Sequence, residues 1–222
     1  MKSIVFTLKR RFRFPQIQRG NFSVKEYFSR YGLQIFFMLT FLLGLVLGIA
    51  YATKADKDFV LRLDFLFLSN MNSRLDMSAF EIFCSCFTSD FLILFLVFCF
   101  SFAPWGTATL PFCTAFKGFS VGVSSAFVFS LYRMSGIGFY ILVILPGAIL
   151  FLFALVSYCK EAFTLSARFL RLSLFGSVKE PYLNRNIRSF FSKSLIALLV
   201  TLGAALLDMI LWVLFAHMFN FS

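Results

Sequence analysis

Long apolar runs separated by short polar stretches dominate the chain. Two of the longest, residues 112–132 and 139–159, lie on either side of a short turn at residues 133–138. Each run has about 20 residues, which at ~1.5 Å of rise per residue spans a hydrocarbon core of ~30 Å. A chain in lipid must satisfy its backbone hydrogen bonds internally. We therefore predict that both runs are helices, paired as a membrane hairpin.

Three further apolar runs predict three more spans, at about residues 33–53, 90–104 and 195–219. The fold class that follows is all-α: a polytopic membrane helical bundle of about five transmembrane helices.

Local signals suggest where some of these helices begin and end. Ser78 and Glu81 form an S-x-x-E capping box, so the helix of the second span can begin there. The segment 104–111, with a proline at each end, is expected to break the helix and reverse the chain. Beyond the fourth span, a helix is expected to continue into a polar region and to end near Pro181.

The composition agrees with residence in a membrane. Of the 222 residues, 60% are hydrophobic and 14% are charged, whereas soluble domains have about 45–50% apolar and about 25% charged residues. The net charge of +11 does not predict nucleic acid as a partner, because basic residues of membrane proteins collect in cytoplasmic loops.

The distribution of charge predicts the topology. Residues 1–32 carry eight basic residues and residues 160–194 carry seven, while residues 54–89 are balanced and the turn at 133–138 has one. By the positive-inside rule, the N-terminus and the 160–194 loop lie in the cytoplasm, and the 54–89 loop is extracytoplasmic. We predict a basic cytoplasmic segment, 1–32, followed by a five-span membrane domain, 33–222.

Two ionisable residues, Lys117 and Asp208, fall inside predicted spans. A charge within the bilayer is costly, so both are candidates for a functional site. Lys117 is close to the cytoplasmic end of its span and can snorkel to the headgroups. Asp208 is deeper, and it can pair with Lys117, stay protonated or form hydrogen bonds within the bundle. A direct pair is disfavoured, because the helical rise separates the two by ~12 Å in depth.

Small residues mark faces where helices can approach closely. Gly44 and Gly48 form a GxxxG pattern, and Gly118 and Gly122 repeat the spacing in the third span. These four glycines are candidates for helix packing or for binding a partner. Pro146, in the fourth span, is expected to produce a packing kink.

The sequence contains no recognisable catalytic or metal-binding motif. There is no glycine-rich phosphate loop, no HExxH, no GxSxG and no pair of glutamates on one helix. Cys84 and Cys86 form CxC without a nearby histidine, which does not predict a zinc site; their redox state stays open. We expect neither an enzyme nor a cofactor.

Several motifs, in order along the chain, resemble the stage II sporulation protein M family of bacterial membrane proteins. The GxxxG of the first span is one, and the start of the third span, Phe116-Lys117-Gly118 followed by Gly122, is similar to the F-x-K-G-x-x-x-G of the family. Gly136 follows at the turn, and Leu145-Pro146 takes the leucine-proline position of the fourth span.

The resemblance implies a scaffold rather than a catalyst. Members of the family are expected to anchor the peptidoglycan-degrading stage II sporulation proteins D and P in the cell membrane, at the septum, during forespore engulfment. The partners would then be lipid and other membrane-anchored proteins, with a homo-oligomer left open. The alternative is a small permease or transporter subunit that uses Lys117 and Asp208, and a water-filled vestibule converging on these two residues would favour it.

Overall fold

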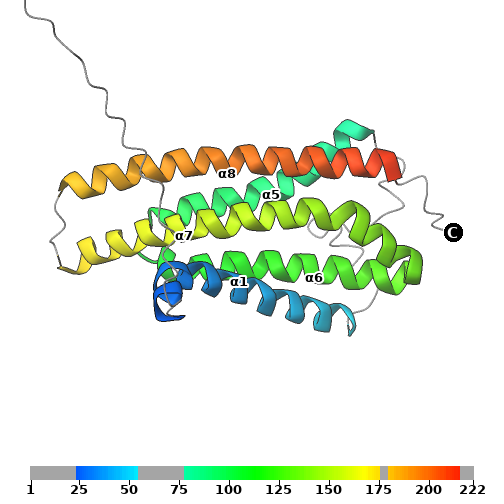
Figure 1. Ribbon diagram of the computed structural model, residues 1–222, viewed down its shortest axis with the longest axis horizontal. Coiled ribbons are helices and arrows are strands. Elements are labelled where there is room, and N and C mark those ends of the chain that lie inside the picture. The colour runs from blue at the N-terminus through cyan, green and yellow to red at the C-terminus, as the bar shows by residue number, and fades with distance from the viewer. Residues whose placement is uncertain (1–23, 55–77, 176–179, 216–222) are drawn as a thin grey trace, which may run out of the picture. The chain divides into compact units, whose positions relative to one another are not determined.

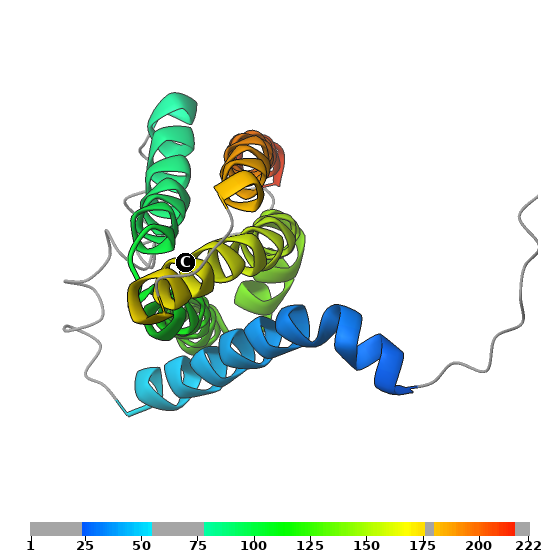
Figure 2. The same cartoon turned by 90° about the vertical axis from the view of Figure 1, so that its left-hand side faces the viewer.

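The computed structural model of the protein describes residues 24–54, 78–175 and 180–215. The chain divides into two units, Met1–Gly32 and Leu33–Ser222, and the contacts that form the helical bundle lie within the second. The helices are α1 (Val24–Ala52), α5 (Ala79–Ser101), α6 (Gly106–Phe139), α7 (Leu145–Phe175) and α8 (Glu180–Phe215), with a π-helix, η1 (Tyr140–Ile144), between α6 and α7. Figures 1 and 2 show these helices from the side and from one end.

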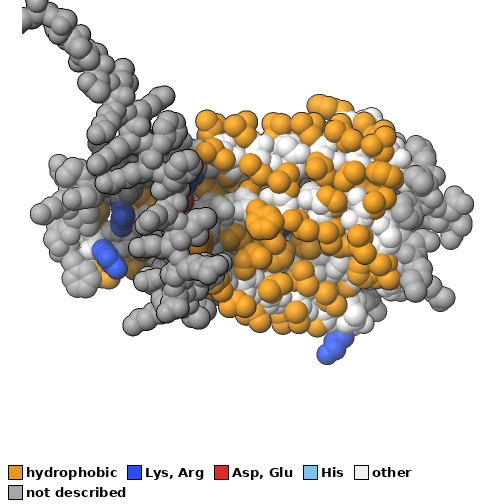
Figure 3. Space-filling view, viewed as in Figure 1, with side chains coloured by type: hydrophobic (Ala, Val, Ile, Leu, Met, Phe, Trp, Pro, Cys, Tyr) orange, Lys and Arg blue, Asp and Glu red, His pale blue; other side chains and the backbone are white. Residues whose placement is uncertain are grey.

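The predicted fold class is confirmed. The helices include five segments that are long and apolar enough to cross a membrane, and the described residues include no strand. The fourth segment, Gly136–Leu174, runs from the end of α6 through η1 into α7. Figure 3 shows hydrophobic side chains over the middle of one face, with the few Lys and Arg side chains towards the ends. The chain is therefore a multi-pass membrane protein, while the cytoplasmic placement of its N-terminus stays a prediction.

The second membrane helix begins earlier than the predicted span. The Ser78 hydroxyl accepts from the backbone N–H of Glu81, and the Glu81 carboxylate accepts from the backbone N–H of Ser78, so the predicted capping box is confirmed. Since α5 starts at Ala79, the predicted loop 54–89 is too long at its C-terminal end. Residues 55–77 lie outside the described part of the chain.

The reversal between α5 and α6 is shorter than predicted. It occupies residues 102–105, and Pro111 lies inside α6 instead of ending the turn. Gly106 permits the tight reversal, because a Cβ there would lie 1.9 Å from the Phe100 carbonyl oxygen. The Ser166 hydroxyl of α7 donates to the carbonyl of Ala103 at 2.7 Å and so ties the turn to the bundle.

The short turn predicted at residues 133–138 has a helical backbone in the structure. The chain does reverse there, and α6 and α7 lie antiparallel in Figure 1, but the backbone stays helical through the reversal. The π-helix η1 follows directly, and its carbonyl at Tyr140 accepts from the N–H of Leu145, five residues on. Pro146 comes next and has no N–H to donate. The bend therefore contains both a π-helical turn and a proline.

The predicted 160–194 loop is mostly helical. α7 continues to Phe175, and α8 begins at Glu180 with Pro181 in its first turn. Proline is favoured there because the first N–H groups of a helix lack intrahelical acceptors. Pro181 therefore starts a helix rather than ending one.

The buried core consists of two apolar clusters. The larger joins α5, α7 and α8 and includes the fully buried Val97, Phe151 and Phe190. The smaller lies where α5 begins and α8 ends, around Phe139 and Trp212, whose rings meet edge to face. Side chains of α5, α6, α7 and α8 also line a cavity within the bundle.

The predicted glycine faces pack against each other. A Cβ on Gly44 would lie 1.9 Å from the carbonyl oxygen of Ala115, and one on Gly118 would lie 2.1 Å from that of Phe41. Gly48 and Gly122 make equally close approaches, at 2.3 Å each. α1 and α6 are thus in backbone contact, so these faces are used for packing within the chain and are covered against any partner.

We predict that Gly118→Ala destabilises the protein by about 1–3 kcal/mol, because the added methyl group forces α1 and α6 apart. Gly203→Ala in α8 is the matched control, since a Cβ at Gly203 would meet nothing within 4 Å. Alanine has the higher helix propensity, so the control should be neutral or more stable by up to about 1 kcal/mol. Unfolding of the purified protein in detergent measures both, and equal stability of the two variants would contradict the close α1–α6 contact.

Candidate functional site

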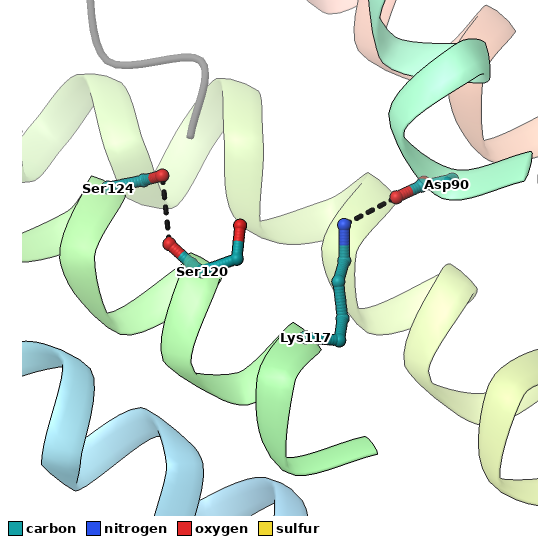
Figure 4. A network of polar contacts seen from close by, with 4 residues as sticks. All are labelled: Asp90, Lys117, Ser120 and Ser124. Atoms are coloured by element: carbon teal, nitrogen blue, oxygen red, sulfur yellow. Dashed lines mark hydrogen bonds and ion pairs between the residues drawn. The ribbon is translucent and has the colours of Figure 1, made fainter. Parts of the chain in front are cut away.

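A buried ion pair joins α5 to α6. The Lys117 ammonium lies 2.5 Å from a carboxylate oxygen of Asp90, with about 11% and 12% of the two side chains exposed. The ammonium also lies 4.9 Å from the ring centroid of Phe151 on α7, which places it over the aromatic face. Figure 4 shows the pair beside Ser120 and Ser124 of α6.

The position of Asp90 in its helix explains why the pair is buried. α5 runs from Ala79 to Ser101, so Asp90 is its middle residue, ~16 Å from either end at helical rise. A carboxylate at that depth is too costly to leave unpaired, and a lysine on the neighbouring helix compensates for it. The prediction that Lys117 snorkels to the headgroups is wrong, because its ammonium points into the bundle.

The ion pair lines a cavity with a volume of about 80 Å³. Its walls come from the N-terminal half of α5, the middle of α6, η1 with the start of α7, and the last turns of α8. The polar and aromatic residues lining it are Ser89, Asp90, Lys117, Ser120, Ser124, Tyr140, Asp208 and Trp212. A water molecule needs roughly 10–15 Å³ by this kind of measure, so the cavity has room for a few waters or a small ion.

Asp208 reaches this cavity from α8 and packs directly on α7. A Cβ built on Gly147 would lie 1.9 Å from a carboxylate oxygen of Asp208, so a larger residue there would require the carboxylate to shift. Gly147 follows Pro146 and the π-helix, so the carboxylate lies against the irregular part of the fourth span. Lys117 makes its ion pair with Asp90 rather than with Asp208.

The structure brings together part of the predicted site and adds to it. Lys117 and Asp208 line one cavity, and Pro146 adjoins it through Gly147. The four glycines, at 44, 48, 118 and 122, lie at the α1–α6 contact instead. Asp90 was not among the candidates predicted from the sequence. The capping box at Ser78 could have indicated it, because a helix that starts there has Asp90 at its centre.

The wall of the cavity brings ionisable and hydroxyl groups together. It contains two carboxyl groups and one amine, with serine hydroxyls beside them. The buried Cys86 also lines it, and neither Cys86 nor Cys84 takes part in a disulfide bond within the described residues. Across residues 24–54, 78–175 and 180–215, no three His, Cys, Asp or Glu side chains gather in the way a metal site such as zinc requires.

Comparison with known proteins yields one match. The model of a family described as Stage II sporulation protein M matches residues 37–211, which reach from α1 into α8 and include every residue of the cavity except Trp212. No curated protein and no solved structure matches the chain.

We predict that Lys117→Ala destabilises the protein by about 3–5 kcal/mol, because it leaves the Asp90 carboxylate buried without its counter-charge. Replacing both partners, Asp90→Leu with Lys117→Met, should restore most of the loss. Lys193→Ala is the matched control: it breaks the Lys193–Glu161 pair, in which about half of the lysine side chain is exposed. That change should cost no more than about 1 kcal/mol. Equal losses for Lys117→Ala and Lys193→Ala in detergent unfolding would contradict the difference in burial.

Proposed function

Because the chain belongs to the stage II sporulation protein M family, we propose that it is a non-enzymatic scaffold of the cell membrane that acts at the sporulation septum during engulfment. The observation that carries the proposal is the family match over residues 37–211. The match extends into all five candidate membrane spans and is not confined to a single helix. A protein made almost entirely of membrane helices is suited to holding other membrane proteins in place.

The partners that this role requires are membrane-anchored enzymes that degrade peptidoglycan. By family resemblance, these are the stage II sporulation proteins D and P. Association in lipid depends on packing between helices and on hydrogen bonds between them, because lipid chains are as apolar as the helix faces. A partner's transmembrane helix would therefore need a complementary face on the outside of this bundle.

The outward faces of the bundle are the surfaces left for such a partner. The glycine faces of α1 and α6 are covered by each other. Large apolar side chains point outward instead from α1, α5 and α8, with Leu43, Phe95 and Leu199 each more than half exposed. A recruited transmembrane helix would replace lipid along one of these three faces.

We predict that a photo-crosslinking residue at position 43, 95 or 199 captures a membrane-anchored peptidoglycan-degrading enzyme in sporulating cells. The same residue at Val97, which is fully buried in α5, is the matched control and should capture nothing outside the chain. The products are identified by mass spectrometry after irradiation at the time of engulfment. If no such enzyme is captured at any of the three outward positions while the tagged protein supports engulfment, direct recruitment through the bundle is wrong.

The second candidate function is a small permease or transporter subunit that uses Lys117 and Asp208. What favours it is the cavity, where both residues occur together with Asp90. Its small volume and its ion pair over Phe151 are not those of a wide vestibule, so transport would require the helices to move. The scaffold is the better-supported proposal because the chain belongs to a family in which that role is expected.

If the protein transports a solute or protons, we predict that flux into liposomes falls at least about tenfold in Asp208→Asn, a loss of ~1.4 kcal/mol or more in the barrier. Glu161→Gln, on the same chain but outside the cavity, should keep the wild-type rate. A pH-sensitive dye inside the liposomes reports protons, and labelled solutes report other cargo. Flux no higher than that of empty liposomes for the wild type would exclude this candidate.

A further inference from the structure

A groove between α7 and α8 is larger than the cavity around Lys117. Its volume is about 560 Å³, within the roughly 300–1,000 Å³ of sites that hold small ligands. One face of α7 forms one wall and one face of α8 forms the other, and Gln34 of α1 also lines it. Phe153 on α7 and Ile196 on α8 are 63% and 56% exposed. The groove therefore opens to the outside of the bundle, where both helices have segments suited to cross lipid.

The groove is charged at one end and apolar along the rest. The charged side chains that line it are Lys160, Glu161 and Lys193. They lie towards the end of the bundle where α7 finishes and α8 starts (Figure 1). The ion pair between Lys193 and Glu161 shows that the two walls are charged at the same level. From that level, the apolar lining follows at residues 150–154 of α7 and at residues 196–200 of α8.

The length of the groove matches one leaflet of a bilayer. Leu150 lies ten residues before Lys160, which is ~15 Å along a helix. A hydrocarbon core is ~30 Å thick, so the lining from the charged end to Leu150 reaches about half of it. A partner's transmembrane helix would cross the full thickness, whereas an acyl chain of a lipid stays in one leaflet. The length therefore favours a lipid as the occupant.

The charge of the lining favours an anionic headgroup. Two lysines and one glutamate give it a net charge of +1. Lys193 donates to Glu161 but has further N–H groups to donate, and no described carboxylate is within ion-pair distance of Lys160. Basic pockets between membrane helices bind the phosphate groups of lipids. The positive-inside rule predicts that this end faces the cytoplasm, where anionic lipids give the leaflet a negative surface potential.

We propose that this groove is a binding site for one anionic phospholipid, with its phosphate at Lys160 and Lys193 and an acyl chain between Phe153 and Ile196. The site goes beyond the scaffold role and does not rest on it. The bound lipid contacts both α7 and α8, so it stabilises the packing of these two helices.

The test titrates the delipidated full chain in detergent with phosphatidylglycerol and with zwitterionic phosphatidylcholine of the same acyl chains. Native mass spectrometry counts the lipids bound. The Kd of the first phosphatidylglycerol should be at least about fivefold lower than that of phosphatidylcholine, since a basic residue near the headgroup contributes ~1 kcal/mol. Equal affinity for the two lipids would overturn the proposal. Glycerol 3-phosphate lacks the acyl chains and should not displace the lipid at equal concentration; displacement would indicate a site for free phosphate instead.

Matched variants separate this groove from general attraction of lipid to a basic protein. Lys160→Gln should raise the Kd of phosphatidylglycerol about fivefold and leave that of phosphatidylcholine unchanged. Arg171→Gln is the control, because this exposed arginine lies further along α7 and outside the groove. Glu161→Gln raises the charge of the lining to +2 and should lower the Kd by a similar factor, which a general loss of stability would not do. Equal effects of Lys160→Gln and Arg171→Gln would overturn the proposal.

A photo-crosslinking residue in place of Phe153 tests the apolar part of the groove in intact membranes. After irradiation it should carry a phospholipid adduct, which mass spectrometry identifies. A protein adduct at this position instead of a lipid would show that a partner helix occupies the groove, and it would overturn the proposal. The comparison of the two lipids on the wild type decides the preference for an anionic headgroup even if a variant does not fold.

Discussion

The buried ion pair between Lys117 and Asp90 is the constraint around which the interior of the bundle is arranged. Each partner lies near the middle of the membrane-spanning part, where an isolated charge is costly, and each makes the other tolerable. A pair of this kind stabilises little by itself, since its desolvation offsets much of its attraction, but it fixes which faces of α5 and α6 must meet. The helices around it therefore enclose a cavity that contains these charged groups, and two apolar clusters pack on the same helices.

Close backbone contact with α6 holds α1 in the bundle, which the ion pair between α5 and α6 does not do. Without a hydrophobic driving force between helices in lipid, attachment of α1 depends on close packing, and Gly44 and Gly118 permit it. A hydrogen bond between Thr40 and Thr114 at 2.9 Å crosses the same contact. The outer face of α1 remains apolar and exposed. One side of α1 is thus committed to the bundle, and the other is free to meet lipid or another helix.

The sequence predicts the part of this arrangement that depends on length and hydrophobicity. Five apolar runs of sufficient length predict five helices, because lipid leaves the backbone no other way to satisfy its hydrogen bonds. Lys117 and Asp208 stand out because they are charges within such runs. Asp90 does not stand out, because its depth depends on α5 beginning at Ala79. The helical reversal near residues 133–138 and the π-helix depend on tertiary packing, and only Pro146 signals a bend.

The same cavity bears on both proposed functions in different ways. A conduit needs a polar path open to both sides, but this cavity is small and Lys117 stays paired between Asp90 and the ring of Phe151. A scaffold needs no path, yet it would not by itself require an acidic residue as deep as Asp208. The packing of the Asp208 carboxylate on Gly147 fits either role, because it holds α8 against the bend of the fourth span without opening the bundle.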